Sequence, residues 1–303
     1  MESMATFEPA FAVLRALHAG GAIVLFGELV FARAVLDRDA AHLDGWRVRM
    51  LAAAWLVATL AWVAWLMAET AAMAGVEWRE TMPLVGRVLA DTGFGHVWLV
   101  RAVLLIALGA LLLRARRKGA PSLPSVILAG LVLASLAWAG HANAHVGVDG
   151  IVDHLAHALH VLAAGAWIGS LRPLAASLHA SSRAEDEVAR TVARYGSLGF
   201  ACVALIVGTG VVIAAYTLGA PMRLVDSDYG HLLLVKLTLF AIVLAVAAAN
   251  RWWLTPTIAR AETSSAATAR GRMRRLAWLE AALGLAIIAL AGALGSAAPP
   301  MSR

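Results

Sequence analysis

Long apolar stretches separated by short polar breaks run through almost the whole chain. Each stretch is on the order of 20 residues long, which is the length that a helix needs to cross a bilayer. The breaks carry Gly, Pro, Asp and Arg, as is typical of loops. The pattern therefore predicts an all-α membrane protein with about eight transmembrane helices, near residues 10–35, 48–74, 96–114, 123–141, 152–172, 194–218, 231–254 and 275–297.

The composition supports this fold class. Of the 303 residues, 61% are hydrophobic and only 15% are charged, whereas soluble domains are about half apolar and about a quarter charged. The bilayer must therefore be the solvent for most of the chain. The single cysteine, Cys202, excludes an intrachain disulfide and any CxxC metal or redox site.

Basic residues orient the predicted helices. Most of them lie after the first, third, fifth and seventh apolar stretches, within residues 33–49, 114–118, 172–194 and 251–275. By the positive-inside rule these segments face the cytoplasm, so both termini are expected on the extracytoplasmic side. We attribute the net charge of +6 to the basic residues that orient the helices, which can also contact anionic lipid. The basic clusters lie between apolar spans without interleaved aromatic residues, so nucleic acid is not an expected partner.

Two pairs of similar segments suggest an internal repeat. Residues 94–101 read FGHVWLVR and residues 229–236 read YGHLLLVK. The dipeptides Leu17-His18 and Leu159-His160 also precede Gly27 and Gly169 by the same spacing. Chance similarity between apolar segments is the alternative explanation.

An even number of helices in each half gives both halves the same orientation in the membrane. We therefore expect two parallel four-helix repeats, residues 1–145 and 146–303, related by an axis along the membrane normal.

The histidines are distributed unevenly across the predicted membrane. Imidazole is the commonest metal-binding side chain and suits copper, zinc, iron and nickel. Eight of the ten histidines fall in outer loops or in the outer halves of helices: His18, His96, His141, His145, His154, His157, His160 and His231. The sequence therefore predicts a metal-binding region on the extracytoplasmic side.

The densest group of histidines lies around the start of the fifth helix. His141 and His145 precede this helix, and Asp153, His157 and His160 are spaced to share one of its faces. Histidines at this spacing can share a metal, and a nearby carboxylate can orient an imidazole. Asp153 has a second interpretation as a helix cap, because carboxylates favour helix N-termini.

Four histidines stand at repeated positions. His18 and His160 are predicted about two turns inside their helices, where an ionisable residue is a functional candidate; the alternative is a neutral histidine that hydrogen-bonds between helices. His96 and His231 stand at helix starts, where bonding to headgroups or loop backbone is an equally good explanation.

Further candidates lie on the second helix. Glu69 is near its outer end, and Met73 carries a thioether, a soft ligand that suits Cu(I). Methionine is also a routine packing residue.

Three charges are predicted within the membrane. Glu28 can pair with a basic residue or line an exit path. Arg101 and Lys236 are close enough to helix starts to extend outward to the interface.

Several of these segments resemble the copper resistance protein D (CopD) family of bacterial inner-membrane proteins. Residues 160–171 read HVLAAGAWIGSL and are similar to the family pattern H-L-L-A-A-x-x-W-x-G-x-L. The remaining similarities are Gly140-His141-Ala142, residues 229–236, Asn250-Arg251 with Pro256, and Leu17-His18 with Gly27.

The resemblance implies copper handling at the bacterial inner membrane, often with a periplasmic copper-binding partner of the CopC type, and no enzymatic activity. It carries ligand roles over to His18, His141 and His160, and less directly a role to Trp167. At position 157 the family frequently has Asp, whereas this chain has His157.

We therefore expect a copper ion, Cu⁺ or Cu²⁺, as the bound metal. The predicted ligands are His18, His141, His145, His157, His160 and Glu69, with His96, His231, Met73 and Asp153 as further candidates.

Two other functions remain open on the sequence. Histidines on facing helices can ligate haem axially, and the repeated positions His18, His96, His160 and His231 are compatible with a membrane cytochrome. A scaffold that binds copper without transporting it is the other alternative. The chain has no GxxxxGK[ST] motif, so ATP-driven pumping by this chain is not expected.

Overall fold

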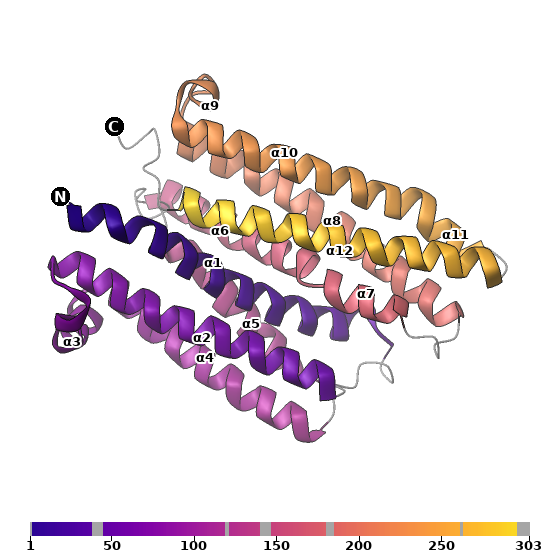
Figure 1. Ribbon diagram of the computed structural model, residues 1–303, viewed down its shortest axis with the longest axis horizontal. Helices are drawn as coiled ribbons and strands as arrows, with labels where there is room; N and C mark the ends of the chain where they lie inside the picture. Colours follow the sequence, from indigo (N-terminus) through magenta and orange to yellow (C-terminus); the bar gives the residue numbers. More distant parts are fainter. Residues whose placement is uncertain are drawn as a thin grey trace.

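The computed structural model describes residues 2–37, 45–118, 121–139, 147–179, 185–260 and 263–295. Within these ranges the regular structure is entirely helical, and the helices lie side by side in one bundle (Figure 1). The long helices are α1 (Glu2–Val30), α2 (Gly45–Ala74), α4 (Gly93–Lys118), α5 (Leu123–Ala134), α6 (Gly147–Ile168), α8 (Glu185–Leu218), α10 (Asp228–Ala249) and α12 (Thr263–Leu294). The shorter elements are η1 (Phe31–Val35), η3 (Trp78–Glu80), α3 (Met82–Asp91), η4 (Ser135–Ala139), α7 (Leu171–His179), α9 (Arg223–Asp226), η6 (Asn250–Leu254) and α11 (Thr255–Arg260).

The all-α membrane fold is confirmed. Seven helical segments in the described part of the chain are long and apolar enough to cross a membrane, and each coincides with one of the predicted stretches. The remaining predicted stretch is shorter, at Leu123–Trp138. Its 12 α-helical residues are followed by 5 residues of 3₁₀ helix, and the steeper 3₁₀ rise brings the segment to about 28 Å.

Several helices extend beyond the predicted apolar stretches. Helix α8 begins at Glu185 rather than near 194, and α12 begins at Thr263 rather than near 275. The predicted fifth helix, 152–172, is broken after Ile168 and continues as α7. Each apolar stretch begins only after a charged segment, but the backbone is already helical in that segment, outside the membrane. Hydropathy alone therefore places the starts of α8 and α12 too late.

Glycines explain the break after α6 and the close crossing of α1. A Cβ added to Gly27 would lie 2.2 Å from the carbonyl carbon of Gly169, so only two glycines allow the backbones to approach so closely. The Ser170 hydroxyl donates to Gly27 O over 3.0 Å. Gly27 and Gly169 are the two glycines at equal spacing from Leu-His in the proposed repeat, and they meet each other. The division at residue 145 itself stays a prediction.

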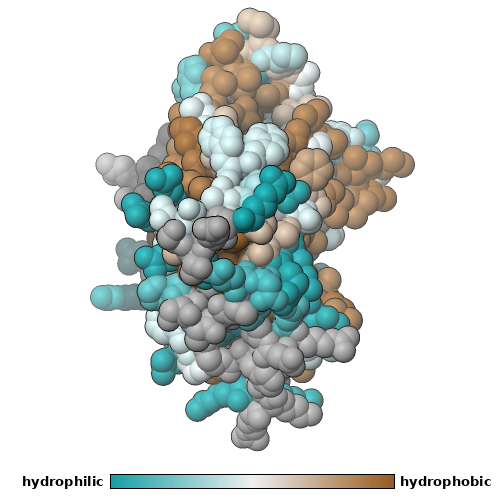
Figure 2. Space-filling model, turned by 90° about the vertical axis from the view of Figure 1, so that its right-hand side faces the viewer, coloured by the Kyte–Doolittle hydropathy of each residue, from teal (hydrophilic) through white to brown (hydrophobic). Residues whose placement is uncertain are grey.

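The bundle has two chemically different ends. Helix α1 begins and α12 ends at the same end, together with α3 and α9 (Figure 1). We call this the histidine end and the opposite one the basic end, where α2, α8 and α12 begin. Figure 2 views the basic end and shows hydrophilic residues across the middle of this face, with hydrophobic residues on its flanks.

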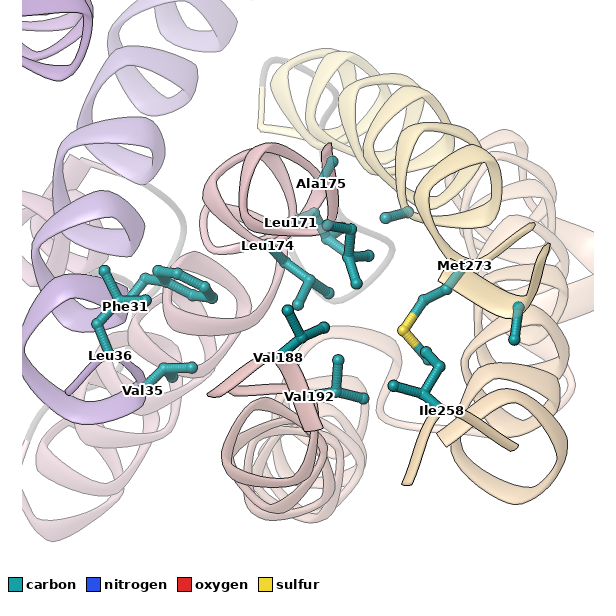
Figure 3. Packing of buried hydrophobic residues seen from close by; sticks show 13 residues of the cluster. Phe31, Val35, Leu36, Leu171, Leu174, Ala175, Val188, Val192, Ile258 and Met273 are labelled. Atoms are coloured by element: carbon teal, nitrogen blue, oxygen red, sulfur yellow. The ribbon is translucent and has the colours of Figure 1, made fainter. Parts of the chain in front are cut away.

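A core of apolar side chains at the basic end joins five elements. Figure 3 shows Phe31 and Val35 of η1 beside Leu174 of α7, with Ile258 of α11 and Met273 of α12 on the other side. Beyond this core, Asp37 makes ion pairs with Arg190 and Arg194 of α8. The hydrogen bond from Arg194 is the main cause that lowers the pKa of Asp37 below its usual value.

Candidate metal centre

His18 is enclosed between α1, α2 and α4. Its side chain is fully buried, and its Nδ1 lies 2.8 Å from the carbonyl oxygen of Ala58 on α2. Because a carbonyl oxygen only accepts, Nδ1 carries the hydrogen and the neutral ring keeps its lone pair on Nε2. Nε2 is also buried and has no hydrogen-bond partner. His18 therefore presents an unused ligand atom inside the first half of the chain.

Aromatic rings and a buried cation line the surroundings of His18. The ring of Trp65 lies 6.2 Å from that of His18, and the Arg101 guanidinium stacks over both Trp65 and Trp98. Arg101 is fully buried and donates to the hydroxyl and carbonyl oxygens of Ser135 over 2.8 and 2.9 Å. The prediction that Arg101 extends outward to the interface is therefore wrong. Its guanidinium is held inside the bundle by Ser135, at the junction of α5 and η4.

His160 occupies the corresponding position in the second half, between α6 and α8. Its Nδ1 lies 3.0 Å from Thr209 Oγ1, and that hydroxyl is 2.6 Å from Leu205 O. With the hydroxyl hydrogen directed at Leu205, Nδ1–H of His160 donates to Thr209 and Nε2 again keeps its lone pair. Lys236 of α10 is close enough to act on His160 electrostatically. Unlike His18, His160 is only partly buried.

Asp153 and His157 form a pair one turn closer to the start of α6. Nδ1 of His157 lies 3.0 Å from Asp153 Oδ1 and 3.0 Å from Asp153 O. Asp153 is almost fully buried, whereas 30% of the His157 side chain is exposed. Helix α6 begins at Gly147, so the interpretation of Asp153 as a helix cap is wrong. His157 Nδ1–H donates to Asp153 O, and the carboxylate lies beside the same ring nitrogen.

His154 lies beside this pair and points elsewhere. Its Nδ1 is 2.6 Å from Gly150 O, and its ring faces Trp138 at 5.4 Å. His157 and His160 thus share one tautomer, with Nδ1–H donated and Nε2 left as the ligand atom. Metal-binding histidines in proteins commonly show this arrangement.

His96 and His231 have a common local role. In each case Nε2 reaches back six residues to a carbonyl oxygen, Ala90 O at 3.0 Å and Val225 O at 2.8 Å. Both rings are exposed. Because Nε2–H is donated, these two histidines connect a short helix to the long helix that follows.

The turns around these histidines match in detail. Thr92 and Ser227 accept from Gly95 N and Gly230 N over 2.9 and 3.0 Å, and both hydroxyls donate to the preceding short helix over 2.6 Å. The FGH and YGH segments therefore adopt the same local structure.

Glu69 and Met73 lie at the histidine end of α2. Glu69 accepts from Trp65 Nε1 over 3.0 Å and pairs with Arg15 of α1 at 3.4 Å. This pairing gives the carboxylate a structural role in joining α1 to α2. Met73 is 53% exposed.

The first, fourth and fifth of the predicted spans correspond to α1, α5 and α6, which pack against one another. His18 and His160 nevertheless face different neighbours, α2 and α8. In the described ranges, no three His, Cys, Asp or Glu side chains are grouped closely enough to hold a metal ion. The predicted ligands His141 and His145 lie outside the described residues.

Sequence comparisons identify the family. Residues 4–151 match the family model "Copper resistance protein D-like, N-terminal domain", and residues 189–294 match "Copper resistance protein D". Copper resistance protein D of Pseudomonas syringae pv. tomato is 31% identical over 260 residues, which cover 83% of this chain and 84% of that protein. The chain belongs to the copper resistance protein D family. The resemblance seen in the sequence is thereby confirmed.

Two other relatives extend the comparison. Inner membrane protein YebZ of Escherichia coli K12 is 29% identical over 82% of this chain and 84% of its own length. Copper transport protein CutJ of Bacillus subtilis is 28% identical over 59% of this chain, a match that covers 35% of that protein. No solved structure matches the chain.

Proposed function

We propose that this member of the family binds copper at its histidine end and moves it across the bacterial inner membrane. The arrangement of His157 and His160 on α6 carries the proposal. Both rings donate Nδ1–H, to the backbone oxygen of Asp153 and to the Thr209 hydroxyl, and the two residues are three positions apart on one helix face. Two Nε2 ligand atoms are thus held in fixed orientations before any metal arrives.

The carboxylate of Asp153 favours a cation at this place. It is almost fully buried, with Oδ1 3.0 Å from His157 Nδ1, and negative charge beside a ligand histidine raises the basicity of the ligand nitrogen. His141 and His145, a few residues before α6 in the sequence, supply further imidazoles for the same ion. The family names, copper resistance and copper transport, supply the identity of the metal.

His18, deep in the first half, serves as a weaker position along the path. A buried cation, Arg101, lies over the same Trp65 ring, and positive charge opposes a resting copper ion. Weak binding suits a transport path, which needs several modest sites rather than one tight site. Nε2 of His18 provides such a position in the first half.

The proposal includes the protein's surroundings. Large apolar side chains such as Val103, Ile106, Phe200 and Val211 are exposed along the long helices, as contact with lipid requires. The inner membrane is proposed as the location, by analogy with the relative named for it. A separate CopC-type periplasmic protein is proposed to deliver or receive copper.

The test measures copper on purified protein in lipid nanodiscs, with Cu⁺ affinity determined by competition with a chelator. His157→Ala and His160→Ala should each lower the affinity on the order of a hundredfold, and both should slow copper movement in reconstituted vesicles. His179→Ala is the matched control, because His179 lies at the basic end beside Arg274.

Native affinity in the His157→Ala/His160→Ala double variant would overturn the proposal. A visible spectrum of the same samples tests the cytochrome alternative. A Soret band in the native protein that is lost in His160→Ala would show that the bound group is haem rather than copper.

A further inference from the structure

A buried carboxyl group lies in the second half of the chain with no cation bound to it. Glu280 stands on α12 and is 2% exposed. It lies inside the apolar stretch predicted for residues 275–297, five residues after Arg275 and therefore toward the basic end of the span. Acids in such positions are rare and mark ion or proton pathways. Glu280 is an addition to the three charges predicted within the membrane, Glu28, Arg101 and Lys236.

The partner of Glu280 is an amide. Asn250 Nδ2 donates to Glu280 Oε1 over 2.6 Å. Asn250 opens the π-helical turn η6 at the end of α10, and such turns frequently occur at functional sites. The other polar atom of the same amide, Asn250 Oδ1, is buried and has no hydrogen-bond donor.

Protonation of Glu280 would satisfy this unpaired acceptor. A neutral carboxyl group has one O–H donor and one carbonyl acceptor, and an amide has the complementary pair. With a proton on Oε2, Glu280 can donate to Asn250 Oδ1 while Oε1 still accepts from Nδ2. With Glu280 ionised, Oδ1 remains unpaired and a charge is left in a low-dielectric interior, which is costly.

No other charged group offsets the carboxylate in the described contacts. The elements packed around α12 carry Arg15, Glu28, Arg172, His179, Lys236, Arg251, Arg260 and, on α8, Tyr195; α6 carries Asp149, Asp153, His154, His157 and His160. Arg172 pairs with Glu28 and Arg15 with Glu69. Arg251 points toward Gly196 of α8. Tyr195 interacts with Glu280 electrostatically and donates to Trp167 O over 3.4 Å.

We propose that Glu280 and Asn250 form a proton-binding site inside the bundle, toward its basic end, which gains and loses its proton as copper moves. The coupling to copper rests on the function proposed above, whereas proton binding does not. The sequence contains no ATP-binding loop, so a proton gradient is a suitable energy source for a chain of this kind.

Glu28 provides a matched control. It is also a buried acid on a spanning helix, 4% exposed, but it pairs with Arg172. The two carboxyl groups therefore differ mainly in their partner, a guanidinium for Glu28 and an amide for Glu280. The arginine keeps Glu28 ionised, so only Glu280 should carry a proton near neutral pH.

The first experiment uses infrared difference spectroscopy of the metal-free protein in lipid vesicles, titrated between about pH 5 and about pH 9. Native protein should show the C=O band of a buried protonated carboxyl group. Glu280→Gln should remove the band, Asn250→Leu should shift it, and Glu28→Gln should leave it unchanged. A titration identical in native protein and in Glu280→Gln would overturn the proton site. Gln at 280 still pairs with the Asn250 amide, so folding is expected to persist, and the melting temperature checks it.

The second experiment measures copper movement and proton movement in the same vesicles. Glu280→Gln should keep equilibrium copper binding and lose at least tenfold of the pH dependence of copper movement. Unchanged pH dependence in this variant would overturn the coupling. If no variant moves copper while the infrared band behaves as expected, the transport function fails and the proton site stands.

Discussion

His18 and His160 occupy corresponding positions in the two halves but have different surroundings. His18 is fully enclosed, with Nδ1 bound to a backbone carbonyl and its ring beside Trp65. His160 is partly open, bound to the hydroxyl of Thr209, and it follows the Asp153–His157 pair on the same helix. The same residue at the same spacing has thus become part of a closed interior in one half and part of an accessible face in the other.

The surroundings of His18 mainly stabilise the bundle, whereas those of His160 mainly favour ligand binding. The first half encloses its histidine with Trp65, Trp98 and Arg101, so much of what surrounds His18 holds α1, α2 and α4 together. The second half places a carboxylate and two oriented imidazoles near the end of a helix. Substitutions that separate the two roles test the comparison.

The largest expected effect is the loss of stability on truncation of His18. His18→Ala leaves a cavity at a fully buried site and removes a hydrogen bond, which should lower the free energy of unfolding by about 3 kcal/mol. His160→Ala should cost less than half of that, because the site is partly open. Thermal unfolding in one detergent measures both.

His18→Asn serves as the control for this pair, because its amide can still donate to Ala58 O and should recover part of the loss. Equal losses for the two alanine variants would contradict the proposed difference between the halves.

The second effect concerns the carboxylate behind His157. Asp153→Asn leaves the backbone acceptor of His157 Nδ1–H in place and removes the negative charge, and it should lower copper affinity by about 10- to 100-fold with little change in melting temperature. Thr209→Val removes the hydroxyl partner of His160 and should cost less, since no charge is lost. Chelator competition measures both variants. A native affinity in Asp153→Asn would show that the Asp153–His157 pair only stabilises α6.

Much of the fold was predictable because apolar stretches of spanning length have few alternatives in a bilayer. For Glu28 the sequence left two alternatives, pairing with a basic residue or lining an exit path, and the structure pairs it with Arg172. The extra helical turns before 194 and 275 were missed because hydropathy does not follow a helix into water. The break at Gly169 depends on contact with Gly27, a long-range contact that local periodicity does not contain.

The site was predictable in part. The spacing of Asp153 and His157 indicated their contact correctly, because residues four apart on a helix are neighbours. The orientation of each ring depends on atoms of other helices, Ala58 O for His18 and Thr209 Oγ1 for His160, which spacing does not specify. Glu280 was visible as the one acid in the predicted stretch 275–297, but its amide partner became apparent only once α10 and α12 were packed together.

The smallest expected effect tests where the two halves are alike. His96 and His231 make the same contact to the preceding short helix, at 3.0 and 2.8 Å, and both are exposed. Each alanine variant should therefore lose one net hydrogen bond, about 1 kcal/mol, and the two losses should agree within about 0.5 kcal/mol. Copper affinity should remain native in both, because Nε2 is committed to a carbonyl. A loss of copper affinity in either variant would show that this histidine is a ligand. The two halves would then differ at the helix starts as well as at His18 and His160.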